Sequence, residues 1–482
     1  MRALARAALV LSVLGLALSA SAQTAAGAKK GGAPAQAAAG KGAMNAGFHV
    51  PVEYYKLPNG LRVVLSEDHT APTAVIAVYY NIGFRIEPKN RTGFAHLFEH
   101  LMFEGSENAP KGTFDKLILG NGGVNNGSTR FDFTNYFEVV PANVLETMLW
   151  LEADRMRALD LDEKHLKNQQ GVVGNEVKVN VLNQPYGGFP WIDVPMAANT
   201  NWYNSHNFYG ELSEIEAATL EDATAFYKTF YAPNNAALVV VGDFDSKQTK
   251  AWIEKYFAKI PAAPQPAKAD LTEPKQTAEK KKVIEDAIAK RPALAVGYHL
   301  PDRNTPEYFA FLLLDQILVQ GNDALLRKEL VKKKGYSSAV SGGMNLLGNQ
   351  FNYNGPMNWM AYLFYDQSVA PEQILSSIDS VISDVQSKPV DKATLELART
   401  KLLSGLYDDL GQLNGFGRAD MLASLALFDD NPARINQLDA ELAKVTPELV
   451  QKTAQDYLRS TNRTVVIREP KKDAPAPAKA GL

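Results

Sequence analysis

The order of strands and helices predicted over residues 47–262 begins again after a segment rich in Pro, Ala and Lys at 263–281. β-Branched and aromatic runs such as 73–80 predict strands, and segments of helical hydrophobic spacing follow them. After the linker, a strand predicted at 293–300 starts the same order again. A chain of 482 residues is also too long for one ordinary core. We therefore expect an α+β fold of two homologous domains, 47–262 and 282–470, each a mixed or antiparallel sheet packed with helices.

Both ends of the chain differ in composition from its middle. Residues 1–22 show the basic start, apolar run and small-residue site of a secretory signal peptide. Residues 23–46 and 471–482 consist largely of small residues, Lys and Pro, and they have too few large apolar side chains to offset the entropy of ordering. We expect a cleaved leader, a disordered spacer and a disordered tail. The mature protein would be exported, to the periplasm of a Gram-negative-type bacterium or to the medium.

Composition excludes several classes of function. The chain has no Cys, so it has no disulfides and no thiol nucleophile, and any metal must be held by His and carboxylate groups. The formal net charge of −3 leaves no basic surplus for nucleic acid. No run beyond the leader is both long enough and uncharged enough to span a membrane. We expect neither a nucleic-acid partner nor a membrane span.

The motif His96-Leu-Phe-Glu99-His100 lies in an apolar-periodic segment that predicts a helix. Positions i and i+4 share a helix face, so both imidazoles can reach one ion. This is the inverted form of H-E-x-x-H, in which two His bind zinc and the Glu activates a water. A catalytic zinc needs a third protein ligand, which in this chain must be Glu, Asp or another His. A five-residue pattern also recurs by chance, and both histidines would then be ordinary surface or core residues.

A longer series of motifs resembles the pitrilysin/insulinase family of zinc peptidases, which includes the mitochondrial processing peptidases and exported bacterial members. The matching segments are Thr92–Ser106, Gly122–Thr129, Asp132, Thr134–Tyr136, Val140–Ala142, Leu151–Met156, Gly171–Glu176, Pro185–Gly187 and Tyr231–Asn235. The resemblance implies that Glu176 is the third ligand of one Zn²⁺ per chain. The apolar stretch around Glu176 agrees, because an unpartnered carboxylate would be costly to bury there. It also implies that the two domains form half of a clamshell chamber.

The same resemblance assigns further roles. Substrate would add as a strand to an exposed sheet edge at 125–129, with Asn126 and Thr129 as contacts. Asn125 and Asn126 are equally typical of a turn. Gln169 stands where the family often has a second carboxylate, so we expect an uncharged hydrogen-bonding residue beside the metal ligands.

The second half lacks the metal motif. Asp315–Val319 stands where the first half has His96–His100, and this sequence cannot bind zinc. Family members supply from this half an Arg and a Tyr that hold the substrate carbonyl. Tyr336 matches the Tyr, but the Arg position falls at Val331 or Lys332, and Lys cannot copy a bidentate guanidinium. The lysines there are equally consistent with a solvated helix end.

Together, the residues and the resemblance predict an exported zinc-dependent endopeptidase of short or unfolded peptides, with Glu99 activating a zinc-bound water. Two alternatives remain because the second half matches weakly. The chain would be the zinc-bearing subunit of a heterodimer whose partner supplies the Arg and Tyr, or a non-catalytic peptide-binding or assembly subunit. We expect a homodimer, or a heterodimer with a related family subunit.

Overall fold

The computed structural model describes residues 49–471. The predicted signal peptide (1–22), the spacer (23–46) and all but the first residue of the tail (471–482) lie outside the described residues. The described residues belong to one compact unit. Between residues 49 and 471, no helix combines the length and apolar character needed to cross a bilayer.

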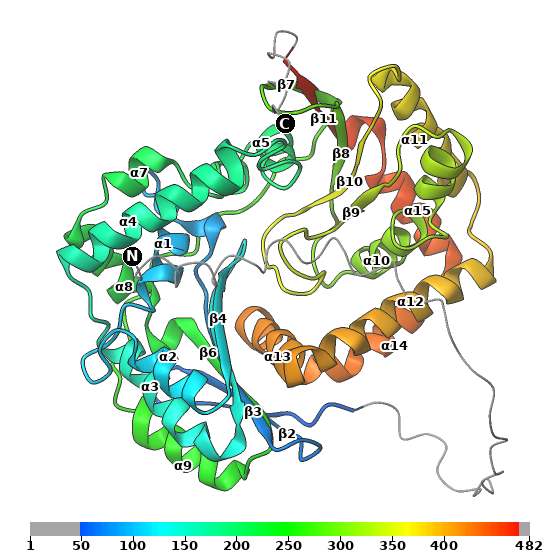
Figure 1. Cartoon of the computed structure of the whole chain (residues 1–482). Helices are drawn as coiled ribbons and strands as arrows, with labels where there is room; N and C mark the ends of the chain where they lie inside the picture. The colour runs from blue at the N-terminus through cyan, green and yellow to red at the C-terminus, as the bar shows by residue number, and fades with distance from the viewer. Residues whose placement is uncertain (1–48, 472–482) are drawn as a thin grey trace, which may run out of the picture. The chain divides into compact units, whose positions relative to one another are not determined.

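Two separate sheets organise the described chain (Figure 1). Sheet 1 has the strand order β1-β2-β6-β3-β5-β4, and sheet 2 has the order β7-β11-β8-β10-β9. Neighbouring strands are antiparallel except for the pairs β2–β6 and β7–β11, which are parallel. The strands are β1 Glu53–Lys56, β2 Arg62–Glu67, β3 Thr73–Tyr80, β4 Val124–Thr129, β5 Thr134–Pro141, β6 Ala236–Gly242, β7 Lys280–Asp286, β8 Ala293–His299, β9 Ser341–Gly343, β10 Asn358–Phe364 and β11 Arg463–Pro470.

Helices cover both sheets, which confirms the predicted α+β fold of two sheets packed with helices. In the first half they are α1 Phe94–Leu101, α2 Thr113–Gly120, α3 Leu145–Arg157, α4 Glu163–Val177, α5 Asp193–Ala198, α6 Trp202–Ser205, α7 Leu212–Glu216, α8 Leu220–Phe230 and α9 Ser246–Phe257. In the second half they are α10 Pro306–Leu318, α11 Pro371–Ser387, α12 Lys392–Gly411, α13 Phe416–Asp429, α14 Leu438–Ala443 and α15 Pro447–Tyr457.

Strand β3 is buried on both faces. Successive side chains of a strand point to opposite faces. Ile76 and Val78 therefore join the core that contains α1 and α3, whereas Val75 and Ala77 join the core that contains α13. Burying a Val or Ile side chain stabilises the fold by about 1.5–3 kcal/mol, so a continuous apolar run is favoured at this position.

Each half contributes a helix to the sheet of the other half. The second-half helix α13 packs on β3 and β6 of sheet 1. Its first residue, Phe416, stacks on Phe137 of the neighbouring strand β5, with ring centroids 3.7 Å apart. The first-half helix α5 packs on β8 and β11 of sheet 2, where Val194 is fully buried. The exchange joins the cores of the two halves, because each sheet needs a helix from the other half to cover its second face.

A buried ion pair also joins the halves. The Arg85 guanidinium donates to Asp132 at 2.6 Å, and both side chains are almost fully buried. The other Asp132 oxygen accepts the backbone N–H groups of Asn354 (2.8 Å) and Gly355 (3.3 Å), which lie on a second-half loop. At Gly355 an added Cβ would lie 2.3 Å from Arg85 Nε, so only glycine fits. The buried charges are thus paired and hydrogen-bonded, as burial of charge requires.

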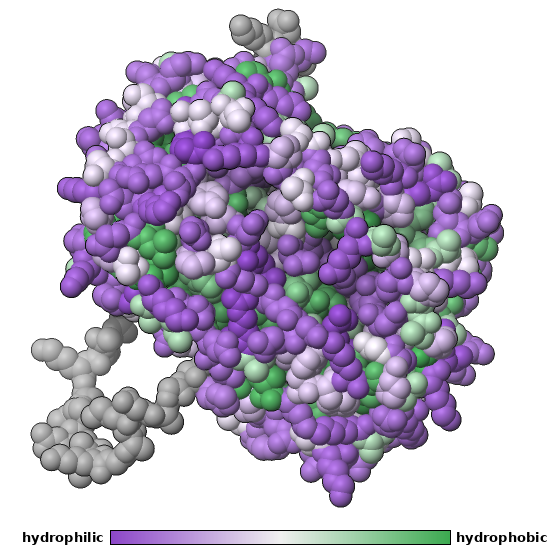
Figure 2. Space-filling view, turned by 180° about the vertical axis from the view of Figure 1, so that it is seen from behind, coloured by the Kyte–Doolittle hydropathy of each residue, from purple (hydrophilic) through white to green (hydrophobic). Residues whose placement is uncertain are grey.

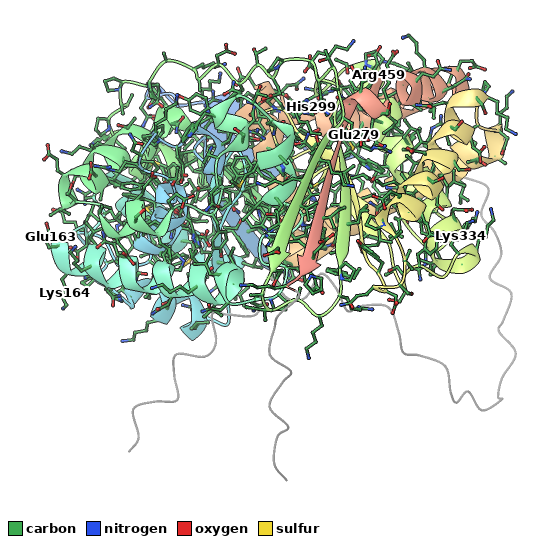
Figure 3. All side chains as sticks on the ribbon, turned by 90° about the horizontal axis from the view of Figure 1, so that it is seen from above. Glu163, Lys164, Glu279, His299, Lys334 and Arg459 are labelled. Carbon is green, nitrogen blue, oxygen red and sulfur yellow. The ribbon has the colours of Figure 1, made fainter. Side chains whose placement is uncertain are left out.

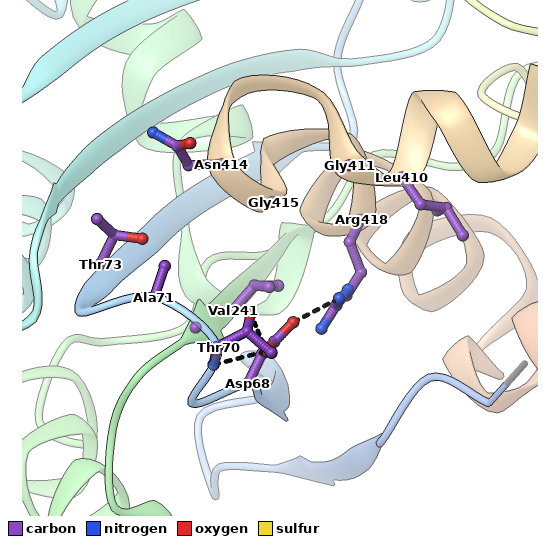
Figure 4. A pocket seen from close by; sticks show the side chains of 11 residues that line it. Asp68, Thr70, Ala71, Thr73, Val241, Leu410, Gly411, Asn414, Gly415 and Arg418 are labelled. Carbon is purple, nitrogen blue, oxygen red and sulfur yellow. Dashed lines mark hydrogen bonds and ion pairs between the residues drawn. The ribbon is translucent and has the colours of Figure 1, made fainter. Parts of the chain in front are cut away.

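A cavity of about 300 Å³ lies where the ends of β2 and β6 and the start of β3 face the turn between α12 and α13 (Figure 4). Its two charged side chains, Asp68 and Arg418, form an ion pair at 2.7 Å. No unpaired charge therefore lines the cavity. On the face seen in Figure 2, hydrophilic residues dominate the surface and apolar residues form small separate groups.

Asp315 on α10 occupies the position that chain order matches with His96. Its carboxylate accepts Trp359 Nε1–H at 2.7 Å and the Gln320 amide at 3.0 Å. Burial raises the pKa of Asp315 from 3.8 to about 6, although these donors act against the shift. A hydrogen-bonded carboxylate beside an indole therefore stands where the first half has an imidazole.

We predict that Asp315→Asn removes a pH dependence of stability. Between about pH 4 and 6, the native state binds more protons at Asp315 than the unfolded state does, so the free energy of unfolding falls as pH rises through this window. The fall should reach roughly 3 kcal/mol and end above about pH 6. Denaturant unfolding of chelator-treated protein across this range measures it. An equal fall in the variant and in the unaltered chain would contradict the assignment.

Candidate metal centre

Helix α1 carries His96, Glu99 and His100. It begins after Gly93, which adopts the left-handed conformation (φ 84°) and has no room for a side chain, because an added Cβ would lie 2.7 Å from Ile215. The face of α1 that anchors it in the first-half core consists of Phe94, Leu97, Phe98 and Leu101. His96 is buried, whereas Glu99 and His100 are half-buried.

Helix α4 packs on α1 and brings Glu176 to the two histidines. The Nε2 atoms of His96 and His100 lie 3.4 Å apart. Glu176 Oε1 is 3.5 Å from His96 Nε2, and Glu176 Oε2 is 3.3 Å from His100 Nε2. The structure thus brings Glu176, which is distant in the sequence, to the other two residues predicted as ligands.

These distances and donor types fit Zn²⁺. A tetrahedral zinc with bonds of about 2.0–2.2 Å holds its ligand atoms about 3.3–3.6 Å apart. The two Nε2 atoms are separated by such a distance, and each of them has one of the two Glu176 oxygens at such a distance. Two imidazoles and one carboxylate are also a usual protein donor set for a catalytic zinc, which keeps another position open. Glu99 is not part of the group whose ligand atoms converge.

The electrostatics of the cluster favour a bound cation. Burial alone would raise the pKa of Glu176, but hydrogen bonds from His100 and His96 and their charges hold it well below its usual range. Burial lowers the pKa of His96, yet Glu176 and Glu99 act more strongly, and the pKa is raised overall. The carboxylate is therefore ionised, and the cluster attracts positive charge.

Glu99 is held by strand β4. Its Oε2 accepts a hydrogen bond from the buried Thr129 hydroxyl at 2.8 Å. The neighbouring Gly127 packs close, since an added Cβ there would lie 3.3 Å from Glu99 Cγ. The resemblance predicts Thr129 as a substrate contact, and the structure directs its hydroxyl to Glu99.

Strand β4 ends sheet 1 and, among the described strands, pairs with β5 alone. Its outer edge therefore carries backbone groups without a strand partner, beside Glu99. Asn126 is half-buried at the middle of this strand, and its Oδ1 accepts the Gly127 N–H at 3.0 Å. The segment predicted at 125–129 is thus an edge strand, although its side chains are half-buried or buried rather than exposed.

Gln169 is buried on α4, and its amide donates to Glu104. Glu104 follows α1 and also accepts from Lys111 at 2.6 Å. The Gln169 Oε1 atom has no hydrogen-bond partner in the described chain. Within residues 49–471, the hydrogen bond of Gln169 therefore joins it to Glu104, three residues beyond α1, and not to a predicted metal ligand.

Tyr336 packs at the border of the second-half core. Of the lysines before it, Lys332 donates to the Asn322 carbonyl at 2.9 Å and Lys333 pairs with Glu329 at 2.9 Å. The Lys334 side chain lies at the surface (Figure 3). No hydrogen bond in the described part of the chain links Tyr336 to the candidate ligands.

Sequence reasoning missed Tyr209, whose hydroxyl donates to Glu176 Oε1 at 2.9 Å. Burial and the negative charge of Glu176 raise the pKa of Tyr209, so it stays protonated as a donor. Its signal in the sequence was only a group of aromatic residues, which usually packs without a further role.

Two acidic side chains, the buried Glu87 and the half-buried Glu214, fix the start of α1 and were also missed. Glu87 accepts the N–H groups of Gly93 (2.8 Å) and Ala95 (2.6 Å). Glu214 accepts the N–H (2.7 Å) and hydroxyl (2.6 Å) of Thr92. An acidic residue a few positions before a glycine that opens a helix is a usable signal for Glu87, because free N–H groups at a helix start favour negative charge.

A second cluster of possible ligands, Asp160, Asp162 and His165, lies at the start of α4. Both aspartates are exposed, and Asp162 caps the helix by accepting the His165 N–H at 2.7 Å. His165 Nδ1 is 3.0 Å from the Asp160 carbonyl. Helix capping accounts for this grouping.

We predict that Glu87→Ala destabilises the start of α1, because two buried N–H groups lose their acceptor. The free energy of unfolding should fall by about 2–4 kcal/mol. Denaturant unfolding and hydrogen exchange at Gly93 and Ala95 measure the effect. The control is Glu163→Ala, which removes an exposed glutamate from the first turn of α4 (Figure 3). An effect no larger than that of the control would contradict the prediction.

Comparison with known proteins gives a consistent result. The model described as "Insulinase (Peptidase family M16)" matches residues 62–186, and "Peptidase M16 inactive domain" matches 217–402. "Zinc protease PqqE" of Helicobacter pylori is 27% identical over 442 residues, which are 89% of this chain and 95% of that protein. "Probable zinc protease PqqL" of Escherichia coli is 27% identical over 221 residues, 43% of this chain and only 23% of that longer protein.

The fold also resembles solved structures. A protease from Helicobacter pylori superposes with a TM-score of 0.80 at 24% identity, covering 87% of this chain and 100% of that one.

Proposed function

Because this chain belongs to the insulinase family of peptidases, M16, we propose that it is an exported zinc-dependent endopeptidase that hydrolyses short or unfolded peptides. The observation that carries the proposal is the convergence of His96, His100 and Glu176, in which each imidazole Nε2 lies 3.3–3.5 Å from a Glu176 oxygen and 3.4 Å from the other Nε2. Glu99 lies beside them and is held in place by Thr129.

The residues of the chain divide the reaction between them. His96, His100 and Glu176 would hold one zinc ion, which when bound polarises the scissile carbonyl and makes water more acidic. Glu99 takes a proton from the attacking water and passes it to the leaving amine, so the carbonyl carbon gains OH and the nitrogen gains H. The β4 edge binds the extended backbone of the substrate as an added strand, with Asn126 beside it.

A second candidate is a zinc-bearing subunit that acts only with a related partner. It is favoured by the second half, where Lys332 and Lys333 are engaged locally and no arginine accompanies Tyr336. In this case the partner would supply the cation that holds the substrate carbonyl. A non-catalytic peptide-binding subunit is less favoured, because a binding role needs no glutamate beside a complete set of zinc ligands.

We predict that the purified chain binds one zinc per molecule and that Glu99→Gln keeps the metal while cleavage of a quenched fluorescent peptide falls by about 10²–10⁴-fold. Metal analysis and chelator-sensitive cleavage measure the two effects. Glu163→Gln, on the exposed start of α4, serves as a control and should change neither.

The proposal of a zinc peptidase would be contradicted if the purified protein held no metal, or if Glu99→Gln cleaved the peptide as fast as the unaltered chain. Zinc binding without cleavage would favour the subunit alternative. The chain would then be assayed again with a related family member from the same organism.

We predict that Thr129→Val lowers kcat about tenfold with little change in KM, because Glu99 loses the donor that orients its carboxylate. Thr129→Ser keeps the hydroxyl and should restore most of the rate. Steady-state kinetics of the three forms give the comparison. A valine variant as fast as the unaltered chain would show that the hydroxyl does not position Glu99.

A further inference from the structure

Tyr209 contacts two of the three candidate ligands. Its hydroxyl donates to Glu176 Oε1 at 2.9 Å, and its ring centroid lies 5.1 Å from that of His96. The side chain is buried, with Phe84 and Trp191 against the ring at 6.4 and 5.8 Å. Its position is therefore fixed by packing and not only by the hydrogen bond.

The backbone around Tyr209 is tied to the start of α1. At Gly210 an added Cβ would lie 2.5 Å from Gly93 Cα, so the two backbone segments are in direct contact at these glycines. The next residue, Glu211, donates its N–H to the Thr92 hydroxyl at 3.0 Å. The segment that carries Tyr209 is therefore in direct contact with the start of the helix that carries His96 and His100.

The Glu176 carboxylate has one short hydrogen bond from a neutral donor, and Tyr209 provides it. The other such donor, the Asn180 amide, lies 3.5 Å from the same oxygen, at the limit of a hydrogen bond. With Oε1 held by the hydroxyl, Oε2 faces His100 Nε2 at 3.3 Å. The hydroxyl leaves the negative charge of the carboxylate available for a cation, since it is a donor without charge.

We propose that Tyr209 is a positioning residue for Glu176. It links the ligand on α4 to the two ligands on α1 and holds the carboxylate in the orientation that receives zinc. This inference rests on the proposed function, because it assumes that zinc is the ligand. It adds a residue outside the ligand set that determines how tightly the metal is held.

The test is Tyr209→Phe, which keeps the ring against His96 and removes only the hydroxyl. Competition with a chromogenic chelator should show zinc bound 10–100-fold more weakly, the usual effect of removing a hydrogen-bond partner of a metal ligand. Tyr227→Phe is the matched control. It removes a half-buried hydroxyl that lies within hydrogen-bond distance of the carbonyls of Arg155 (2.7 Å) and Met156 (2.8 Å), and zinc affinity should not change.

A double-mutant cycle separates positioning from general destabilisation. In a Glu176→Ala background the hydroxyl has no carboxylate to orient, so Tyr209→Phe should leave the remaining zinc affinity unchanged. Zinc held equally by Tyr209→Phe and the unaltered chain overturns this inference alone, as does an equal loss in the Glu176→Ala background. Absence of zinc from the unaltered chain overturns the proposed function as well. Thermal unfolding of the metal-free forms, expected to be similar for both phenylalanine variants, completes the comparison.

Discussion

A carboxylate that faces two imidazoles in a largely buried site keeps its position only if separate parts of the chain hold it there. Glu176 meets His96 and His100 because α4 packs along α1, and these contacts keep its pKa low despite burial. The start of α1 is held in turn by Glu87 and Glu214. Such acceptors fix the start of the helix because leaving N–H groups unpaired there would be costly. The geometry of the candidate centre depends on this framework.

The framework is stable because the two halves complete each other's cores. α13 covers one face of sheet 1, and α5 covers one face of sheet 2. The buried Arg85–Asp132 pair adds a link whose charges are costly to separate. Within the described chain, β4 pairs only with β5, and its outer edge lies next to Glu99 without a strand partner.

The second half also has a sheet packed with helices, but it lacks a counterpart of the two histidines. Asp315 stands where chain order matches His96, and it accepts a hydrogen bond from Trp359. In the segment where the family resemblance predicts an arginine, Lys332 and Lys333 bind to neighbouring groups of the same half. The second half therefore contributes α13 and the loop around Gly355 to the architecture, and it offers no second zinc site among the described residues.

The sequence by itself determined the fold class, and through the family resemblance it predicted the edge strand β4 and the three residues that converge. The signals were local. They are hydrophobic periodicity, the spacing of His96 and His100 on one helix turn, and the series of family motifs, and all of them can be read in the sequence alone. Only the tertiary structure revealed the hydrogen bonds of Tyr209, Glu87 and the Thr129 hydroxyl. Such contacts join residues that no shared periodicity relates, so they leave no periodic pattern in the sequence.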